Sequence, residues 1–398
     1  MDIKKIRQDF PILQNGIIYF DNAATSLTPE QVLGAMNDYY RNYKANIHRG
    51  VHRMSMEASK AYEAAHEKVA KFIGARPEEI IFTKNTTEAI NLVALSIDWK
   101  SGDKVVTTMI EHHSDILPWM LLKKRGVVVE FVREDAEGTI DLEDLKKKAE
   151  GAKLIAVVHV SNVLGCIAPV KEIGKIAKKA GALYLVDGAQ SVPHMAINVK
   201  DIGCDFLAFS GHKMLGPTGT GILFMKKELA EKMEPGILGG GTINKVTLEG
   251  FELAKIPDRW EAGTPNIAGM IGLGAAIDYL NAVGMKNIEK HEAELTKLAY
   301  EGLSKIDKVE VYGPKDLKKR NGIVPFNIRG MKPHDAASML DNIGKIAVRS
   351  GHHCAMPLAD RIIRRPEGTV RASFYLYNTS EEVEKLIKTV KEIAKMAP

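Results

Sequence analysis

Cysteine is scarce in this chain, which has only Cys166, Cys204 and Cys354 among its 398 residues. The number is odd, the three residues lie far apart, and no two of them form a Cys-x-x-Cys pair. A disulfide framework is therefore not expected, and a reducing cytoplasm is the expected location. One of the three thiols is left as a candidate reactive group.

Long hydrophobic runs are missing as well. No segment reaches the length of a membrane span, and residues 1–7 carry too much charge for the apolar core of a signal peptide. There is neither a low-complexity tract nor an internal repeat. We therefore expect neither a membrane protein nor a secreted one.

A strong excess of one charge is also lacking, because 55 basic residues face 50 acidic ones and the net charge is +5. The densest basic stretch, residues 315–320, includes Asp316 and is typical of a solvated loop. Since Lys and Arg are scattered and form no stripe, a nucleic-acid partner is not expected.

A nucleotide-binding loop is incomplete. The glycine-rich segment Gly216–Gly221 has no Lys-Ser/Thr pair, and an apolar, strand-like run follows it where a helix would be needed. An enzyme that uses a dinucleotide or a nucleoside triphosphate is therefore not expected.

Residues 60–225 alternate short apolar runs with amphipathic segments. The runs are 80–83, 105–109, 127–132, 154–160, 183–186, 206–209 and 221–225. This alternation predicts an α/β fold whose mostly parallel sheet is covered by helices on both faces. The last run, 221–225, is expected at an edge of the sheet.

The character of the chain changes after about residue 264. Helical patterns over 268–283 and 288–306 precede strand-like runs at 309–311, 323–328 and 369–374, and a capping box of Thr379 with Glu382 opens a final helix. The length predicts more than one domain. We expect a large domain over 15–264 and a smaller α+β C-terminal domain over 265–398, with residues 1–14 packed on the latter.

Two of the apolar runs end in reactive polar groups. Lys213 closes Ser210-Gly211-His212-Lys213 after one run, and Asp187 follows the other. Ligands bind at the carboxyl ends of strands in open α/β sheets. A lysine in such a place is suited to a Schiff base with an aldehyde cofactor, and a buried carboxylate would keep a pyridine nitrogen protonated. The pair therefore favours pyridoxal phosphate chemistry.

A phosphate site is expected between the first strand and its helix. Thr86 and Thr87 offer hydroxyls and backbone N–H groups at a helix N-terminus, although capping alone explains the same residues. Ser210 and His212 could donate to the same phosphate.

Further polar residues follow other strands. His112 could stack on a cofactor ring, Gln190 could bind its phenolic oxygen, and Asn162 could reach that oxygen or a substrate carboxylate. Arg371 is suited to clamp a carboxylate, with a surface salt bridge as the alternative. A metal site around Glu111 and its neighbours is disfavoured because adjacent residues in a turn do not converge easily.

The third cysteine has an unusual setting. Cys354 follows His352 and His353, in a loop that starts at Arg349 and is bounded by glycine and proline. Reactive thiols occupy such electropositive, accessible places. A zinc site is the rival interpretation, but consecutive residues do not fit one tetrahedral ion. Cys166 and Cys204 lack basic neighbours and are expected to act as small apolar residues.

Taken together, several ordered motifs resemble the class V aminotransferase-like family of PLP enzymes, and within it the group II (Suf-type) cysteine desulfurases and selenocysteine lyases. The resemblance runs from end to end of the chain. The motifs are Tyr19–Thr25, His48–His52, Thr86–Asn91, Met109–His113, Asp187–Gln190, Ser210–Lys213 and Arg349–Ala355.

The resemblance implies a fold-type I PLP-dependent homodimer. In it, Lys213 carries the cofactor, Asp187 binds the pyridine nitrogen, Gln190 binds the phenolic oxygen and His112 stacks on the ring. Other roles that the resemblance implies are phosphate binding by Thr86, Thr87, Ser210 and His212, contact with the partner subunit's phosphate by Thr264, substrate binding by Asn162, Arg349 and Arg371, and sulfur acceptance by Cys354. One departure is Asn85, where a glycine is expected; asparagine is tolerated at helix caps.

The expected activity is conversion of L-cysteine to L-alanine, with a Cys354 persulfide passed to an acceptor protein for iron–sulfur cluster assembly. Selenocysteine lyase and cysteine sulfinate desulfinase are alternatives on the same fold. A non-catalytic sulfur-carrier scaffold is a further alternative, against which Lys213, Asp187 and Gln190 argue.

Overall fold

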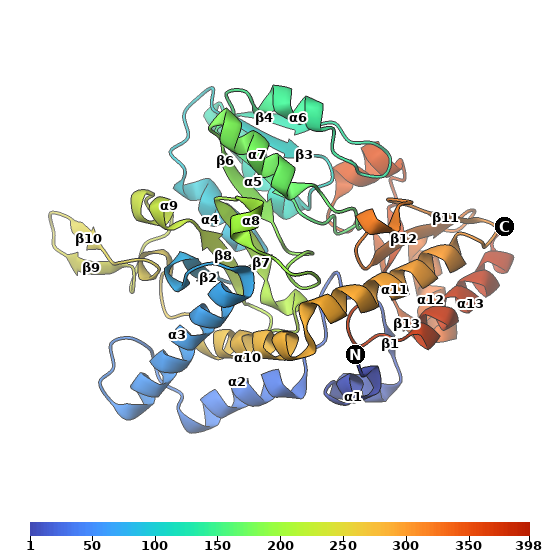
Figure 1. Cartoon of the computed structure of the whole chain (residues 1–398), viewed down its shortest axis with the longest axis horizontal. Helices are drawn as coiled ribbons and strands as arrows, with labels where there is room; N and C mark the ends of the chain where they lie inside the picture. The colour runs from blue at the N-terminus through green and yellow to red at the C-terminus, as the bar shows by residue number, and fades with distance from the viewer.

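The computed structural model describes all 398 residues, and a seven-stranded sheet forms its larger part (Figure 1). The strand order is β2-β8-β7-β6-β5-β3-β4. The strands are β2 (Ile80–Thr83), β3 (Lys104–Thr108), β4 (Val128–Val132), β5 (Leu154–Val158), β6 (Leu183–Asp187), β7 (Phe206–Ser210) and β8 (Gly221–Met225). Strands β4, β3, β5, β6 and β7 run parallel, so their carboxyl ends lie at one edge of the sheet.

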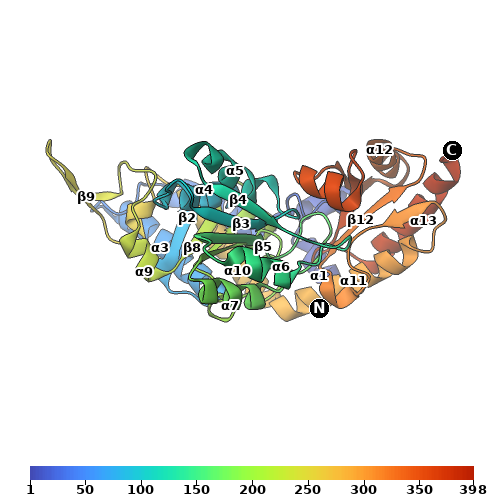
Figure 2. The ribbon, with the colours of Figure 1, turned by 90° about the horizontal axis from the view of Figure 1, so that it is seen from above.

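Both faces of the sheet are buried, as predicted. On β5, Leu154 and Ala156 join one apolar core, while Ile155 and Val157 join the other. Figure 2 shows helices on both sides of the sheet. The helices are α4 (Thr86–Ser96) and α5 (Leu117–Leu122) on one side, and α3 (Arg53–Ile73), α6 (Leu142–Ala149), α7 (Val170–Ala180), α8 (Val199–Ile202) and α10 (Ile267–Val283) on the other.

The expectation that residues 221–225 form an edge strand is wrong. Strand β8 lies between β7 and β2, is antiparallel to both, and is buried along its whole length. Strand β2, which pairs only with β8, forms this edge of the sheet. An all-apolar run of this kind fits an interior strand, since both of its faces need cover.

A second sheet forms near the C-terminus. It has four antiparallel strands in the order β11-β12-β15-β14, with bounds Val309–Val311, Ile323–Ile328, Thr369–Ser373 and Arg349–Gly351. Helices α11 (Met285–Leu303), α12 (Pro333–Gly344) and α13 (Ser380–Met396) pack on it around a separate apolar core. The capping box predicted at Thr379 and Glu382 is confirmed at the start of α13. A short parallel pair, β1 (Ile18–Tyr19) with β13 (Ile346–Ala347), adds the N-terminal segment.

The predicted domain limits stay a prediction, but the packing of α10 bears on them. This helix packs against α2 (Glu30–Asn42) and α3, and it contributes to the core under the large sheet. It meets α11 at a 75° bend. Helix α10 thus packs with the large sheet, and the chain turns toward the C-terminal sheet at Gly284, where the two helices meet.

The N-terminal helix α1 (Ile3–Gln8) touches the C-terminal part. Arg7 pairs with Glu382 of α13 at 2.8 Å and donates to the carbonyl of Tyr377 at 2.7 Å. Helix α9 (Lys227–Lys232) and a protruding hairpin, β9 (Ile243–Val246) with β10 (Phe251–Leu253), complete the chain (Figure 1). No single helix has the length and apolarity to span a membrane; only α10 and α11, bent against each other, pass that test as a pair.

Candidate active site

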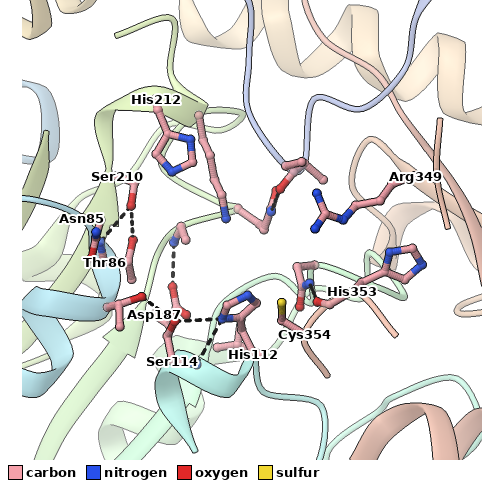
Figure 3. Close-up of a pocket in the computed structure, with 18 of the residues that line it drawn as sticks. Asn85, Thr86, His112, Ser114, Asp187, Ser210, His212, Arg349, His353 and Cys354 are labelled. Carbon is pink, nitrogen blue, oxygen red and sulfur yellow. Dashed lines mark hydrogen bonds between the residues drawn. The ribbon is translucent and has the colours of Figure 1, made fainter. Parts of the chain in front are cut away.

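The carboxyl ends of the parallel strands open into a cavity of about 250 Å³ between the two sheets (Figure 3). Every predicted site residue except Thr264 lines it. These residues are Thr86, Thr87, His112, Asn162, Asp187, Gln190, Ser210, His212, Lys213, Arg349, Cys354 and Arg371. Residues more than 280 positions apart in the sequence therefore share one site.

Asp187 is the last residue of β6 and lies at the floor of the cavity. Only 2% of its surface is exposed, and its Oδ1 accepts the backbone N–H of Ala189 at 2.9 Å. Burial raises the pKa of Asp187, while the Ala189 hydrogen bond and the positive charge of Lys213 act in the opposite direction. A buried carboxyl of this kind is suited to bind a protonated ring nitrogen.

Lys213 ends a short 3₁₀ turn after β7, so that its amine reaches the same cavity. Burial, helped by the nearby Arg371 and Arg349, lowers its pKa to about 8 against the opposing effect of Asp187 and Cys354. The neutral amine, which is the nucleophilic form, is thus accessible close to neutral pH.

We expect the lysine to capture pyridoxal phosphate in a pH-dependent way. The neutral, reactive amine of Lys213 predominates at a pH above its pKa in the folded protein. The rate at which cofactor-free protein captures the cofactor covalently should therefore rise with pH and level off above about pH 8. Stopped-flow absorbance would measure this rate. An exposed lysine, tested as N-acetyl-lysine in the same buffers, should show a rate still rising at pH 10. A protein rate that parallels the model amine would contradict the assignment.

A cradle for a phosphate lies at the start of α4. Ser210 Oγ accepts the backbone N–H of Thr86 at 2.8 Å and lies 2.6 Å from Thr86 Oγ1 (Figure 3). Asn85 caps the helix by accepting the Glu88 N–H, so its presence in place of the expected glycine is compatible with the cap. A Cβ on Gly221 would lie 2.4 Å from the Asn85 backbone, which explains why glycine starts β8.

His212 and Thr87 complete this end of the cavity. Burial, helped by Lys213, lowers the pKa of His212 to about 4, so its imidazole is neutral near pH 7. Its Nδ1 lies 3.3 Å from Thr25 Oγ1, and the other nitrogen is left for a ligand. Thr87 Oγ1 lies 2.6 Å from Ser114 Oγ. Hydroxyls, a neutral imidazole and helix N–H groups suit an anion.

The orientation of His112 follows from its own turn. Its Nδ1 accepts the backbone N–H of Ser114 at 3.1 Å, so the ring proton belongs on Nε2. Burial, and then the charge of Lys213, lowers the pKa of His112 to about 3. A neutral ring of fixed tautomer thus borders the cavity, suited to stacking on an aromatic cofactor.

Buried polar atoms without a partner test whether a polar cofactor and substrate fit. Four of the residues that line the cavity have such atoms: Gln190 Oε1, Asn162 Oδ1, His353 Nδ1 and Arg371 Nε. Gln190 Nε2 donates to the carbonyl of Ala23 at 2.7 Å, which leaves its second amide hydrogen for a phenolic oxygen. Because buried polar atoms are normally paired, these groups fit a polar ligand such as pyridoxal phosphate.

Arg371 is fully buried on β15 and is held from two sides. It donates to the carbonyl of Asn162 at 2.7 Å and to Asp21 Oδ1 at 3.2 Å. Arg349 lies 4.0 Å from the other oxygen of Asp21. Burial lowers the pKa of Arg371 to about 10, so it stays charged near neutral pH. Two arginines with one internal carboxylate leave a positive charge for a substrate carboxylate.

The loop around Cys354 is held in an unusual backbone conformation. His353 and Cys354 have φ values of 53° and 56°, in the left-handed region that non-glycine residues rarely occupy. The carbonyl of Cys354 accepts the N–H of His113 at 2.7 Å, and His113 Nε2 accepts the N–H of Met356 at 3.1 Å. These contacts hold the exposed thiol against the turn that carries His112 (Figure 3).

Thr264 is the predicted residue that the structure does not bring to this site. It is exposed and lines a separate surface cavity with His48 and Arg49. Its proposed contact with the partner subunit's phosphate therefore stays a prediction.

Sequence reasoning missed the roles of three residues. Asp21 fixes both arginines, Ser114 fixes the tautomer of His112, and the His353 carbonyl accepts from Asn162 Nδ2 at 2.7 Å. Asp21 belongs to the Tyr19–Thr25 motif, which could have pointed to it. No signal in the sequence gives the other two contacts, because they depend on the folded turns.

Comparisons with known proteins agree with this site. The aminotransferase class-V family model matches residues 18–386. A probable cysteine desulfurase of Pyrococcus abyssi is 52% identical over 394 residues, covering 98% of this chain and 97% of that protein. The structure of the apo cysteine desulfurase of Thermococcus onnurineus NA1 matches with a TM-score of 0.96 and 52% identity, over 99% of this chain and 98% of that one.

The Escherichia coli cysteine desulfurase CsdA, solved in an S-sulfonic acid form, matches with a TM-score of 0.92 and 34% identity over 100% of both chains. The expected fold-type I architecture is thereby confirmed, with its mostly parallel sheet and smaller C-terminal sheet. The order and identity of the site motifs, the geometry of the cavity and these full-length matches agree. The chain belongs to the class-V aminotransferase family.

Proposed function

We propose that this chain is a pyridoxal phosphate-dependent cysteine desulfurase, which converts L-cysteine to L-alanine and keeps the sulfur as a persulfide on Cys354. The observation that carries the proposal is the presence of Lys213, Asp187 and the exposed Cys354 around one cavity. Class-V cysteine desulfurases use this cofactor. A carrier scaffold without catalysis would have no use for the buried Lys213 and Asp187.

The residues that line the cavity have different roles in binding the cofactor and the substrate, according to their positions. Asp187 holds the ring nitrogen, His112 covers the ring, and Gln190 binds the phenolic oxygen. Thr86, Thr87, Ser210 and His212 hold the phosphate at the start of α4. Pyridoxal phosphate, when bound, supplies an electron sink for charge that develops on the substrate carbon. Arg371, Arg349 and Asn162 orient the substrate carboxylate so that the Cα proton faces the Lys213 amine, which removes it as a base.

Sulfur transfer is assigned to Cys354. Its thiolate attacks the sulfur of the substrate, a new S–S bond forms, and the C–S bond breaks with its electron pair left on the carbon skeleton. The former sulfur-bearing carbon then takes up a proton, Cα regains the proton that Lys213 removed, and the skeleton leaves as alanine. His112 Nε2–H and the protonated Lys213 are the proton donors that border this part of the cavity.

The proposal extends to partners and location. We propose that the persulfide passes to an acceptor protein for iron–sulfur cluster assembly, because an exposed thiol is open to a second protein. The three free cysteines favour a cytoplasmic enzyme. No specific observation favours selenocysteine or cysteine sulfinate over cysteine as substrate.

We propose a homodimer in which Thr264 acts across the interface. Thr264→Ala should weaken retention of pyridoxal phosphate by about tenfold, since a hydrogen bond to a charged phosphate is lost. Thr264→Ser keeps the hydroxyl and should restore retention. Dialysis with absorbance detection would measure retention of the cofactor, and sedimentation would measure the oligomeric state. A fully saturated, active monomer at assay concentration would refute the proposal.

Alanine formation tests the function itself. With L-cysteine alone, turnover should be slow, because the loop over 351–358 is tied to His113 and cannot carry its persulfide far. A reductant should raise the rate severalfold by clearing the thiol. Alanine should be quantified with L-cysteine and L-selenocysteine, each with and without dithiothreitol. No alanine from either amino acid would refute the activity, and an equal rate without the reductant would refute the account of the loop.

A further inference from the structure

Two carboxyl groups lie beneath the active site and have no part in the steps above. Glu111 and Asp115 flank the turn that presents His112, and neither has any exposed surface. Acidic residues are almost never fully buried unless they are paired.

Glu111 is held by one oxygen only. Its Oε1 accepts the hydroxyl of Thr108 at 2.6 Å and the backbone N–H of Val158 at 2.9 Å. Its Oε2 is buried and accepts no hydrogen bond from an N–H or O–H group of the protein. Val158 stands opposite Asp187 in the register of β5 and β6. Glu111 thus connects the His112 turn to the strand beside Asp187.

Asp115 shows the same asymmetry. Its Oδ1 accepts the indole N–H of Trp119 at 2.9 Å, whereas its Oδ2 is buried without a donor. Burial is the main cause that raises the pKa of Asp115, and a hydrogen bond with the Glu111 carboxyl acts on it in the opposite direction. Two carboxylates cannot hydrogen-bond to each other without a proton. The two unpartnered oxygens are satisfied together if one proton lies between them.

We propose that Glu111 and Asp115 share one proton between Oε2 and Oδ2, and that this singly charged carboxyl pair positions the His112 turn and sets the electrostatic potential at Asp187. The proposal rests on the proposed function only for its effect on the cofactor. The pair is a positioning group, since neither residue lines the cavity.

The surroundings agree with a single remaining charge. Burial, followed by charge repulsion, raises the pKa of both carboxyl groups well above the ordinary value; the repulsion on Glu111 comes mainly from Asp115, and that on Asp115 comes from Asp187. The charge of Asp187 raises the pKa of both groups. Glu134 lies after β4 and accepts the Met109 N–H at 2.9 Å. Cys166 and Tyr184 also interact with the charge of Glu111, and both are neutral near pH 7 because burial raises their pKa.

The negative charge of the pair has a direct consequence for the cofactor. Together with Asp187 it stabilises positive charge in the cavity, both on the ring nitrogen and on the protonated link to Lys213. Removal of that charge should lower the pH at which the holoenzyme loses its visible absorption band.

Amide variants separate the proton from the charge. Glu111→Gln or Asp115→Asn alone keeps one carboxylate and supplies an N–H in place of the shared proton, so charge and hydrogen bond both survive. The double variant removes the charge. We expect the midpoint of the visible band to stay near the wild-type value in each single variant and to fall by about one pH unit in the double variant.

Infrared spectroscopy tests the shared proton without any reference to activity. The difference spectrum between the protein as purified and each single variant should show the loss of the carbonyl stretch of one protonated, buried carboxyl. A difference spectrum without that loss, for either single variant, would overturn the shared proton. An unchanged midpoint in a folded double variant would overturn the electrostatic role. Because the infrared result is independent of catalysis, failure of the proposed function would leave it standing.

Discussion

Cys354→Ala should retain pyridoxal phosphate and lose nearly all alanine production from L-cysteine, by roughly a hundredfold or more. The side chain contributes no contact to the phosphate cradle or to Asp187, so binding of the cofactor should survive. The sulfur of cysteine is a poor leaving group and needs a nucleophile to take it. Steady-state alanine formation measures the loss.

Selenocysteine should separate chemistry from structure in the same variant. A selenol is more acidic than a thiol and its bond to carbon is weaker, so part of the activity on L-selenocysteine should remain. Cys204→Ala is a suitable control, since that thiol is fully buried in the core of the large sheet and does not line the cavity. Equal loss on both substrates would assign Cys354 a structural or acid role. Undiminished activity on cysteine would refute the persulfide mechanism.

The second large effect is expected for Lys213→Ala. Loss of the amine removes both the covalent link to the cofactor and the base at the substrate carbon, so alanine formation should fall by roughly a thousandfold or more. Borohydride reduction followed by mass spectrometry should find pyridoxal phosphate fixed to the wild-type protein and absent from the variant.

A matched control is available on the next strand. Lys226 follows β8 and pairs with Asp205 at 2.6 Å, outside the cavity, so Lys226→Ala should keep the covalent link and the activity. Cofactor that remains fixed by borohydride in Lys213→Ala would show that another lysine carries it.

The sequence allowed much of the fold to be predicted, because the apolar runs of the large sheet follow simple periodicity. Strands β2 and β12 have the expected bounds, and three strands of the C-terminal sheet lie where strand-like runs were expected, whereas β14 forms at the start of the segment that was expected to be a loop. The place of β8 could not be predicted, since strand order depends on which surfaces pack together and not on the local pattern. The same reason applies to α10, whose side of the molecule is decided by contacts with α2 and α3.

The cavity was predictable where strand ends deliver polar residues, as at Asp187 and Lys213. It was less predictable where loops from distant segments meet. Asp21 lies on the N-terminal segment, yet its carboxylate binds Arg371 and faces Arg349 of the C-terminal sheet. The hydrogen bond from His113 to the Cys354 loop depends on the left-handed backbone of His353 and Cys354, which the local sequence did not predict. The role of Thr264 stays a proposal, because its expected partner lies on another subunit.

The central claim is that Cys354 receives the sulfur of the substrate. Mass spectrometry of the Cys354 peptide after a single turnover with L-cysteine, without reductant and with the free thiols alkylated, tests it most directly. We predict that the peptide gains one sulfur atom, in step with one alanine released per active site, and that added dithiothreitol removes it. Alanine release with an unmodified Cys354 peptide would contradict the claim.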